Sequence, residues 1–142
     1  MIMTFNFLII GCLLGLVSIG LFSFNKIKAA ILLLVSASFF IGLFFALVDP
    51  FLHLWDEQFH ALVSKNLSKH LLKPTLFETP ILDYDYKAWY ANHIWLHKQP
   101  LFLWQMALSQ LIIGHTELGI RFPDVIMHTI LTFIVFDIGK LN

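Results

Sequence analysis

The sequence predicts an all-α multi-pass membrane protein, with about three transmembrane helices and an outer loop that carries amphipathic interfacial helices. Of its 142 residues, 58% are hydrophobic and only 13% are charged. Soluble domains carry about 25% charged residues, so this composition favours a membrane protein. Two uncharged segments, 5–24 and 29–48, each reach the length of about 20 apolar residues that a helix needs to cross a bilayer.

The first apolar segment, 5–24, also has an interpretation as a cleaved signal peptide. It lacks the basic residues that open such a peptide, and its apolar stretch is longer than the usual limit of about 15 residues. We therefore interpret it as a retained transmembrane helix. Its Gly11 and Gly15 permit close approach of a neighbouring helix, which we assign to ordinary helix packing.

Basic residues next to the apolar segments predict the orientation. Lys26 and Lys28 lie between the first two spans, and basic residues in short loops favour the cytoplasmic side. The N-terminus and the residues after Asp49 would then lie outside, and Lys140 at the far end agrees with this. Asp49 precedes Pro50 and marks the end of the second span, because a residue before proline is pushed out of helical geometry.

Residues 49–100 form a polar insert between apolar segments. They hold six of the nine acidic residues, five of the nine basic residues and five of the seven histidines. The formal net charge of the chain is zero, which gives no electrostatic case for nucleic acid as a partner. Cys12 is the one cysteine and lies in an apolar run, so the sequence predicts neither an internal disulfide nor a cysteine-based metal site.

The insert predicts two helices at the membrane surface, joined by an irregular stretch. Residues 56–73 place lysines on one helical face and these apolar side chains near the other: Phe59, Leu62, Val63, Leu67 and Leu71. That pattern is typical of an amphipathic helix resting on a membrane. Residues 101–113 are too short to span, and we expect a helix at or dipping into the outer interface. Its apolar face is formed by Leu101, Trp104, Leu108, Leu111 and Ile112.

Residues 122–140 predict a third span that runs from outside to inside. The domain organisation is then two transmembrane helices with a short cytoplasmic loop at 1–48, an extracytoplasmic loop at 49–121 and a third helix at 122–142. Three spans around one elaborate loop look incomplete. We therefore expect this chain to be the N-terminal part of a longer membrane protein.

The candidate functional residues of the insert also have structural interpretations. Asp56 and Glu57 suit the start of a helix, where the backbone dipole favours acids. His93 and His97 could share a metal if their stretch were helical. The stretch does not read as helical and no neighbouring acid completes a site, which favours structural or interfacial histidines. Lys98 could be a snorkelling interfacial lysine.

Three segments in order resemble the N-terminal part of a known family. Asp56-Glu57 follows a span, Lys98-Gln99-Pro100-Leu101 comes later, and the segment GHTELGIRFPD at 114–124 runs into the next span. This arrangement resembles the polyprenyl-phosphate-dependent glycosyltransferases of the GT-C superfamily. The group is glycosyltransferase family 39, with the protein O-mannosyltransferases and the aminoarabinose transferases of lipid A. The resemblance covers roughly residues 49–140.

The sequence departs from the family pattern at several positions. Gln99 stands where the family usually has Pro, and Phe122 and Asp124 replace Leu and Ser. The span at 5–24 precedes the usual first one. Family members are several times longer, with more spans and a distal outer domain, so we expect the isolated chain to be inactive.

The resemblance implies transfer of a sugar, with inversion, from a polyprenyl-phosphate donor to a lipid or protein acceptor. The reaction would take place at the outer face of the plasma membrane, which in bacteria is the inner membrane. Asp56 would take the proton of the acceptor hydroxyl, and we expect it to be partly desolvated, which strengthens a carboxylate as a base. Glu57 would support it or contact the acceptor.

The resemblance also implies residues that contact the donor phosphate and residues of the loop that could contact the acceptor. Lys98 would contact the donor phosphate, whose negative charge grows in the transition state. Arg121 could assist there or serve a structural role. His93 and His97 are acceptor or loop candidates. A divalent metal is left open, and none is assigned.

Two other functions compete with a glycosyltransferase. One is a small non-catalytic membrane protein whose outer loop binds a lipid or a partner subunit. The other is part of a transporter, which is disfavoured because, apart from His128, the spans lack the ionisable residues of a transport pathway.

Overall fold

The computed structural model describes residues 2–85 and 87–140. Five α-helices and one short 3₁₀ helix make up the regular structure of this part, with no strand in it, so the predicted all-α class is confirmed there. The chain divides into two compact units, which are described separately: a long-helix unit (1–50 and 124–142) and an insert unit (51–123). The helices are α1 (Ile2–Ser23), α2 (Ile27–Val48), α3 (Asp56–Leu67), η1 (Trp89–Ala91), α4 (Pro100–Ile113) and α5 (Glu117–Gly139).

Among the described residues, α1, α2 and α5 are the helices long and apolar enough to cross a membrane. α1 and α2 coincide closely with the two uncharged segments of the sequence. The turn between them places Asn25 at a φ of 56°, a left-handed conformation that asparagine tolerates better than most residues. The three predicted spans are therefore present as helices of sufficient length and hydrophobicity.

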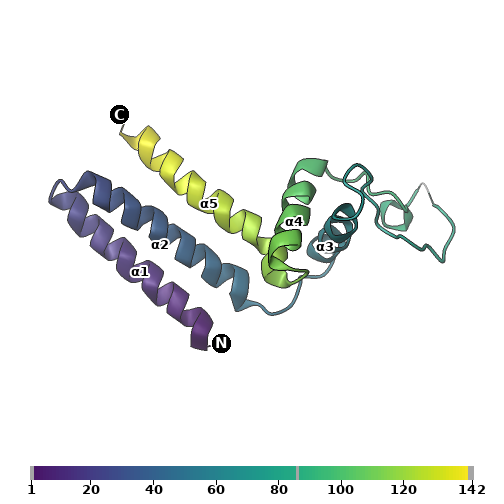
Figure 1. Cartoon of the computed structure of the whole chain (residues 1–142), viewed down its shortest axis with the longest axis horizontal. Helices are drawn as coiled ribbons and strands as arrows, with labels where there is room; N and C mark the ends of the chain where they lie inside the picture. The colour runs from purple at the N-terminus through teal and green to yellow at the C-terminus, as the bar shows by residue number, and fades with distance from the viewer. Residues whose placement is uncertain (1, 86, 141–142) are drawn as a thin grey trace. The chain divides into compact units, whose positions relative to one another are not determined.

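Glycine lets α1 and α2 pack closely as an antiparallel pair (Figure 1). A Cβ added to Gly11 would lie 2.6 Å from Cγ1 of Ile41 and 3.0 Å from the carbonyl oxygen of Ala37. The Ser18 hydroxyl donates to the Ala30 carbonyl oxygen at 2.7 Å, which satisfies a buried polar group inside the pair. The close contact at Gly11 therefore agrees with the helix-packing role that we assigned to it.

α5 packs against α2 through small and hydroxyl-bearing side chains. Val125 fills the space beside Gly42, where an added Cβ would lie 3.1 Å from Cγ1 of Val125. The hydroxyls of Ser38 and Thr132 lie 2.8 Å apart and share a hydrogen bond between the helices. In a lipid environment, burial of apolar surface does not favour helix association, so hydrogen bonds of this kind help to hold helices together.

The third long helix begins earlier than the sequence predicted. We expected it to start at residue 122, whereas α5 starts at Glu117. The Thr116 hydroxyl accepts the Gly119 backbone N–H at 3.1 Å, which caps the new start. The helix continues through Pro123, which lacks a backbone N–H.

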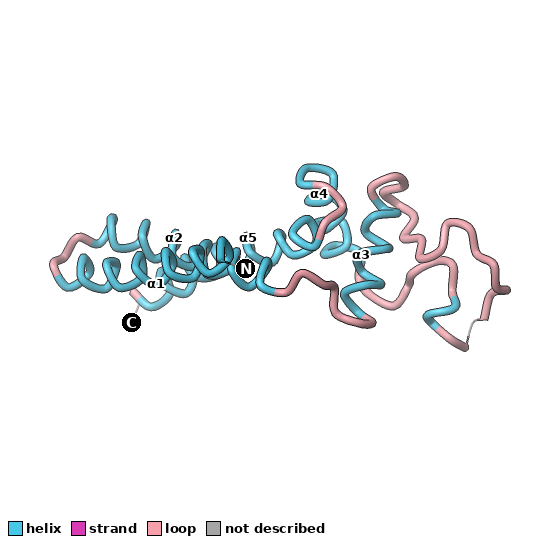
Figure 2. Tube along the Cα trace, turned by 90° about the horizontal axis from the view of Figure 1, so that it is seen from below, coloured by secondary structure: helices cyan, strands magenta, loops and turns pink. Residues whose placement is uncertain are grey.

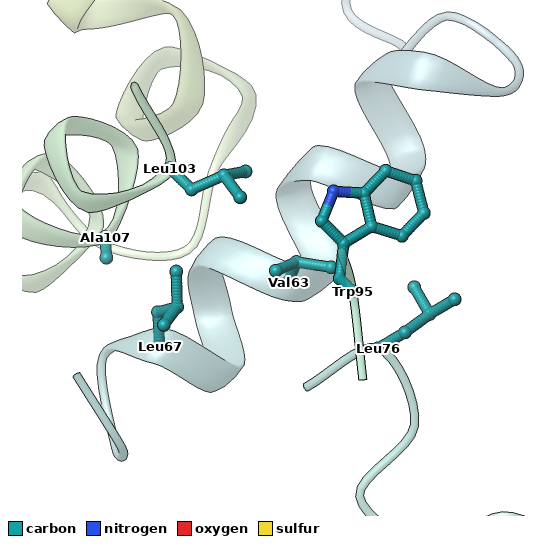
Figure 3. Close-up of a cluster of buried hydrophobic side chains, with 6 residues drawn as sticks. All are labelled: Val63, Leu67, Leu76, Trp95, Leu103 and Ala107. Carbon is teal, nitrogen blue, oxygen red and sulfur yellow. The ribbon is translucent and has the colours of Figure 1, made fainter. Parts of the chain in front are cut away.

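The core of the insert unit lies between α3, α4 and the loop that joins them. Figure 3 shows Leu103 and Ala107 of α4 on one side of α3, with Leu76 and Trp95 of the loop on the other. Six buried side chains form this core: Val63, Leu67, Leu76, Trp95, Leu103 and Ala107. The apolar face of α3 was expected on the membrane surface, but its centre at Val63 and Leu67 is fully covered by protein.

α3 ends at Leu67 rather than at residue 73, and near this end the Asn66 side chain bonds to a later segment of the loop. The Asn66 side-chain amide donates to the carbonyl oxygens of Thr75 and Leu76, at 2.9 Å and 3.3 Å. The segment that follows is mostly loop, as the sequence predicted (Figure 2). An isolated bridge between Thr75 and Ile94 holds it.

Candidate functional site

An ion pair joins the start of α3 to the start of α5 within the insert unit. The Arg121 Nε lies 2.6 Å from Oε1 of Glu57, and its Nη2 lies 3.1 Å from Oε2, which is a two-point contact. The same Nη2 donates to the Phe51 carbonyl oxygen at 2.7 Å, and the His53 backbone N–H donates to Oε2 of Glu57 at 2.6 Å. The two charged side chains keep only 12% and 19% of their surface exposed.

This pair fixes the charge of Glu57. The hydrogen bond from Arg121 lowers the pKa of the Glu57 carboxyl, and it outweighs the opposing effect of burial. The bond from the His53 backbone and the positive charge of Arg121 act in the same direction. A carboxylate held in this way stays ionised and is a poor proton acceptor, so Glu57 is suited to anchoring rather than to base catalysis.

Asp56 differs from its neighbour in its surroundings. It opens α3 and its side chain is exposed, so the partial desolvation that we expected for it is not present. Trp55, directly before it, has a φ of 69°, an uncommon conformation for a bulky residue. Backbone strain of this kind is often found at functional sites, where neighbouring structure holds it in place.

His60 brings further candidates together, and the sequence analysis missed it. Its ring packs edge-on against Phe102, with 4.8 Å between ring centroids. Burial lowers the pKa of His60, the nearby Asp56 opposes this, and the positive charges of Lys98 and His97 add to it. Asp56, Lys98 and His97 therefore all lie within electrostatic reach of one imidazole. The four-residue spacing from Asp56 to His60 on α3 is the sequence signal that could have revealed it.

The two predicted loop histidines occupy different environments. His97 stacks on Trp89, with 4.7 Å between ring centroids and 14° between planes. The His93 Nε2 lies 3.2 Å from the Leu82 carbonyl oxygen. Neither lies on a helix, as expected, and the described residues contain no group of three or more His, Cys, Asp or Glu side chains placed to hold a metal.

A buried polar chain crosses the insert unit and had no sequence signal. The Gln110 side-chain amide donates to the Ser64 hydroxyl at 2.5 Å, and the Gln110 oxygen lies 2.7 Å from Nδ1 of His115. Ser64 donates in turn to the Ala61 carbonyl oxygen at 3.1 Å. This chain joins α3, α4 and the turn before α5 to one another.

An apolar groove of about 640 Å³ opens on the loop side of α3. It is a second feature that the sequence did not predict, because its walls come from separate segments. They include Trp55, Phe59, Phe77, Ile81, Leu82 and Tyr90.

Comparisons with protein-family models, curated proteins and solved structures found no match to this chain. The class that the structure itself defines is an all-helical protein in which, among the described residues, three helices are long and apolar enough to span a membrane. Its insert unit contains an ion pair, an exposed acid, a half-buried histidine and an exposed lysine.

Proposed function

We propose that this chain forms the N-terminal part of an inverting glycosyltransferase that uses a polyprenyl-phosphate sugar donor at the outer face of a membrane. One observation carries the proposal. The three segments of the family resemblance, 56–57, 98–101 and 114–124, all belong to the insert unit except for Asp124. Glu57 binds Arg121 across 64 residues of sequence, and Asp56 and Lys98 both act on His60.

The geometry supports a division of labour between the two acids. Glu57 is committed to Arg121, whereas Asp56 is exposed and open to an acceptor. Asp56 takes the proton as the acceptor oxygen forms its bond to the anomeric carbon, and the bond from that carbon to the phosphate oxygen breaks. The polyprenyl phosphate leaves with the bonding electrons, and the configuration at the anomeric carbon inverts.

The two cations have correspondingly different roles. Lys98 is exposed directly before α4, where its ammonium group can meet the phosphate of a lipid donor. Arg121 already donates to Glu57 and to the Phe51 carbonyl oxygen, which supports the structural one of its two predicted roles. The acceptor is a lipid or a protein, and the membrane is the plasma membrane.

A non-catalytic lipid- or partner-binding protein is the second candidate function. The apolar groove beside Trp55 and Phe59 is the observation in its favour, because it offers space for an apolar ligand without using Asp56.

The test measures transfer from polyprenyl-phosphate-linked hexoses and pentoses by membranes that contain the full gene product. We expect Asp56→Asn to lower the rate by about 10²–10⁴-fold, the usual contribution of a general base. Asp83→Asn is the matched control, since Asp83 is an exposed acid elsewhere in the insert unit, and it should leave the rate unchanged.

A binding measurement separates the two candidate functions. Lys98→Gln should weaken the binding of polyprenyl monophosphate. Quenching of tryptophan emission by the bound lipid measures this binding. Normal transfer by Asp56→Asn would exclude that residue as the base. If Lys98→Gln leaves lipid binding unchanged and no sugar transfer is detected, the non-catalytic function is favoured.

A further inference from the structure

α4 is apolar on two opposite sides, and only one of them is covered. Leu103 and Ala107 point into the core of the insert unit and are almost completely buried. The other side carries a stripe at helical spacing in which the three leucines are between 59% and 65% exposed. It consists of Leu101, Trp104, Leu108 and Leu111.

A hydrogen bond extends this stripe onto a second segment. The Trp104 indole N–H donates to the Leu71 carbonyl oxygen at 2.7 Å, which holds the turn after α3 against α4. That turn carries Leu71 and Leu72, which are 61% and 90% exposed. We call the combined surface the apolar face; it consists of Leu71, Leu72, Leu101, Trp104, Leu108 and Leu111.

We propose that the apolar face docks onto a lipid bilayer, at the boundary between headgroups and acyl chains, and favours anionic phospholipid. A position at the membrane surface was predicted for both α3 and α4, but the apolar side chains of α3 turn out to build the protein core instead. The six residues of the apolar face take no part in the proposed glycosyl-transfer chemistry, so their docking is tested independently of that function.

Chain connectivity joins the insert unit directly to helices that are long and apolar enough to cross a membrane. Phe51 follows the last residue of α2 by three residues, and α5 runs without a break from Glu117 in the insert unit to Gly139. Because an extended chain covers at most about 3.6 Å per residue, the link to α2 spans at most about 11 Å. The bilayer is therefore the apolar phase that this surface meets at the highest effective concentration.

Two exposed lysines lie close to the apolar face in the sequence. Lys73 directly follows Leu72, and Lys98 lies three residues before Leu101. Lysines near a membrane surface attract the anionic headgroups of phospholipids. A two-fold contact with a second copy would instead bring identical lysines together, because such an interface uses the same surface on both subunits. Trp104, with its polar edge satisfied, is also a typical residue of the bilayer interface.

Spin labels at single cysteines test this surface in the intact chain. Cys12→Ser removes the one native cysteine. Leu72→Cys and Leu108→Cys place labels on the apolar face, and Lys65→Cys places one on the exposed side of α3. Ala107→Cys marks the protein core as a buried reference. The labelled chains are reconstituted into phosphatidylglycerol and phosphatidylcholine vesicles, and collision with oxygen is compared with collision with a water-soluble nickel chelate.

Oxygen concentrates in lipid, whereas the nickel chelate stays in water. We expect the oxygen-to-nickel accessibility ratio at positions 72 and 108 to be several-fold higher than at position 65, and higher with phosphatidylglycerol than without it. Nickel accessibility equal to that at position 65 would overturn the proposal in favour of a free surface. Low accessibility to both reagents, as at position 107, would overturn it in favour of a protein partner or a second copy. An equal ratio in both lipids would overturn the preference for anionic phospholipid.

Discussion

Replacing Glu57 by Gln removes the charge from a carboxylate that Arg121 contacts at two points and the His53 backbone at a third. The substitution keeps the shape of the side chain, so the core of the insert unit is left intact. It removes one counter-charge from the Arg121 guanidinium, which is largely buried, since only 12% of that side chain is exposed.

The expected cost follows from this burial. A hydrogen bond to a charged group contributes about 1.5–3 kcal/mol, and breaking a fully buried pair costs about 3–5 kcal/mol. Because Glu57 keeps 19% of its side-chain surface exposed, the lower range applies. We expect Glu57→Gln to lower the free energy of unfolding of the insert unit by about 2 kcal/mol. For a unit of this size, that corresponds to a Tm lower by about 8–16 °C.

Tryptophan emission measures this unit within the intact chain. All four tryptophans of the sequence, Trp55, Trp89, Trp95 and Trp104, lie between residues 51 and 123. Thermal unfolding in detergent, followed by their emission, therefore reports on the insert unit alone. Asp56→Asn is the matched control: its carboxylate is exposed in the first turn of α3, where an acid contributes about 1 kcal/mol or less through the helix dipole.

The pH dependence of the unfolding free energy provides a second test of the pair between Glu57 and Arg121. The folded-state pKa of Glu57 lies below its ordinary value of 4.5. Its contribution to stability is therefore fully present above pH 4.5 and is lost as the pH falls from there through the folded-state pKa. Glu57→Gln should lack this loss. An equal Tm for Glu57→Gln and Asp56→Asn, or no coupling in a double-mutant cycle with Arg121→Gln, would refute the reasoning.

Two further predictions concern the core of the insert unit, and the same emission assay measures both. Leu67→Ala should lower the free energy of unfolding by about 2–5 kcal/mol, because Leu67 is fully buried. Leu62→Ala, at a position 38% exposed on the same helix, should cost clearly less, and equal costs would contradict the assigned core. Burial lowers the pKa of His60, so the unfolded chain binds its proton first and stability should fall as the pH drops below 6.5. His60→Phe should remove this slope, and an unchanged slope would assign it to another group.

Local signals predicted the helices whose ends depend on nearby residues. The uncharged lengths of α1 and α2, and the proline at the start of α4, are visible in the sequence itself. The end of α3 was not predictable, because Asn66 reaches the carbonyl groups of Thr75 and Leu76. The start of α5 had a signal in Thr116, whose hydroxyl accepts the Gly119 N–H, but the predicted helix was started at residue 122, five residues later than Glu117.

The candidate site was less predictable than the helices. Asp56, Glu57, Lys98 and Arg121 were named from a resemblance, yet no local pattern pairs Glu57 with a residue 64 positions away. The burial of His60 depends on Phe102 and Trp95, which belong to other segments. The chain from Ser64 through Gln110 to His115 depends in the same way on tertiary contacts.

The bonds of Arg121 to Glu57 and to Phe51 join the first residues of the insert unit to its last residues. The two ends of the insert are therefore held together by contacts that do not involve the loop between α3 and α4. For such a closed loop, the entropy of closure rises only with the logarithm of length, by about 0.6 kcal/mol for each doubling. Between its core residues Leu76 and Trp95, this loop can thus accept insertions or a grafted recognition segment while Asp56 keeps its place at the start of α3. New specificities in this part of the loop would therefore require no change in α1, α2 or α5.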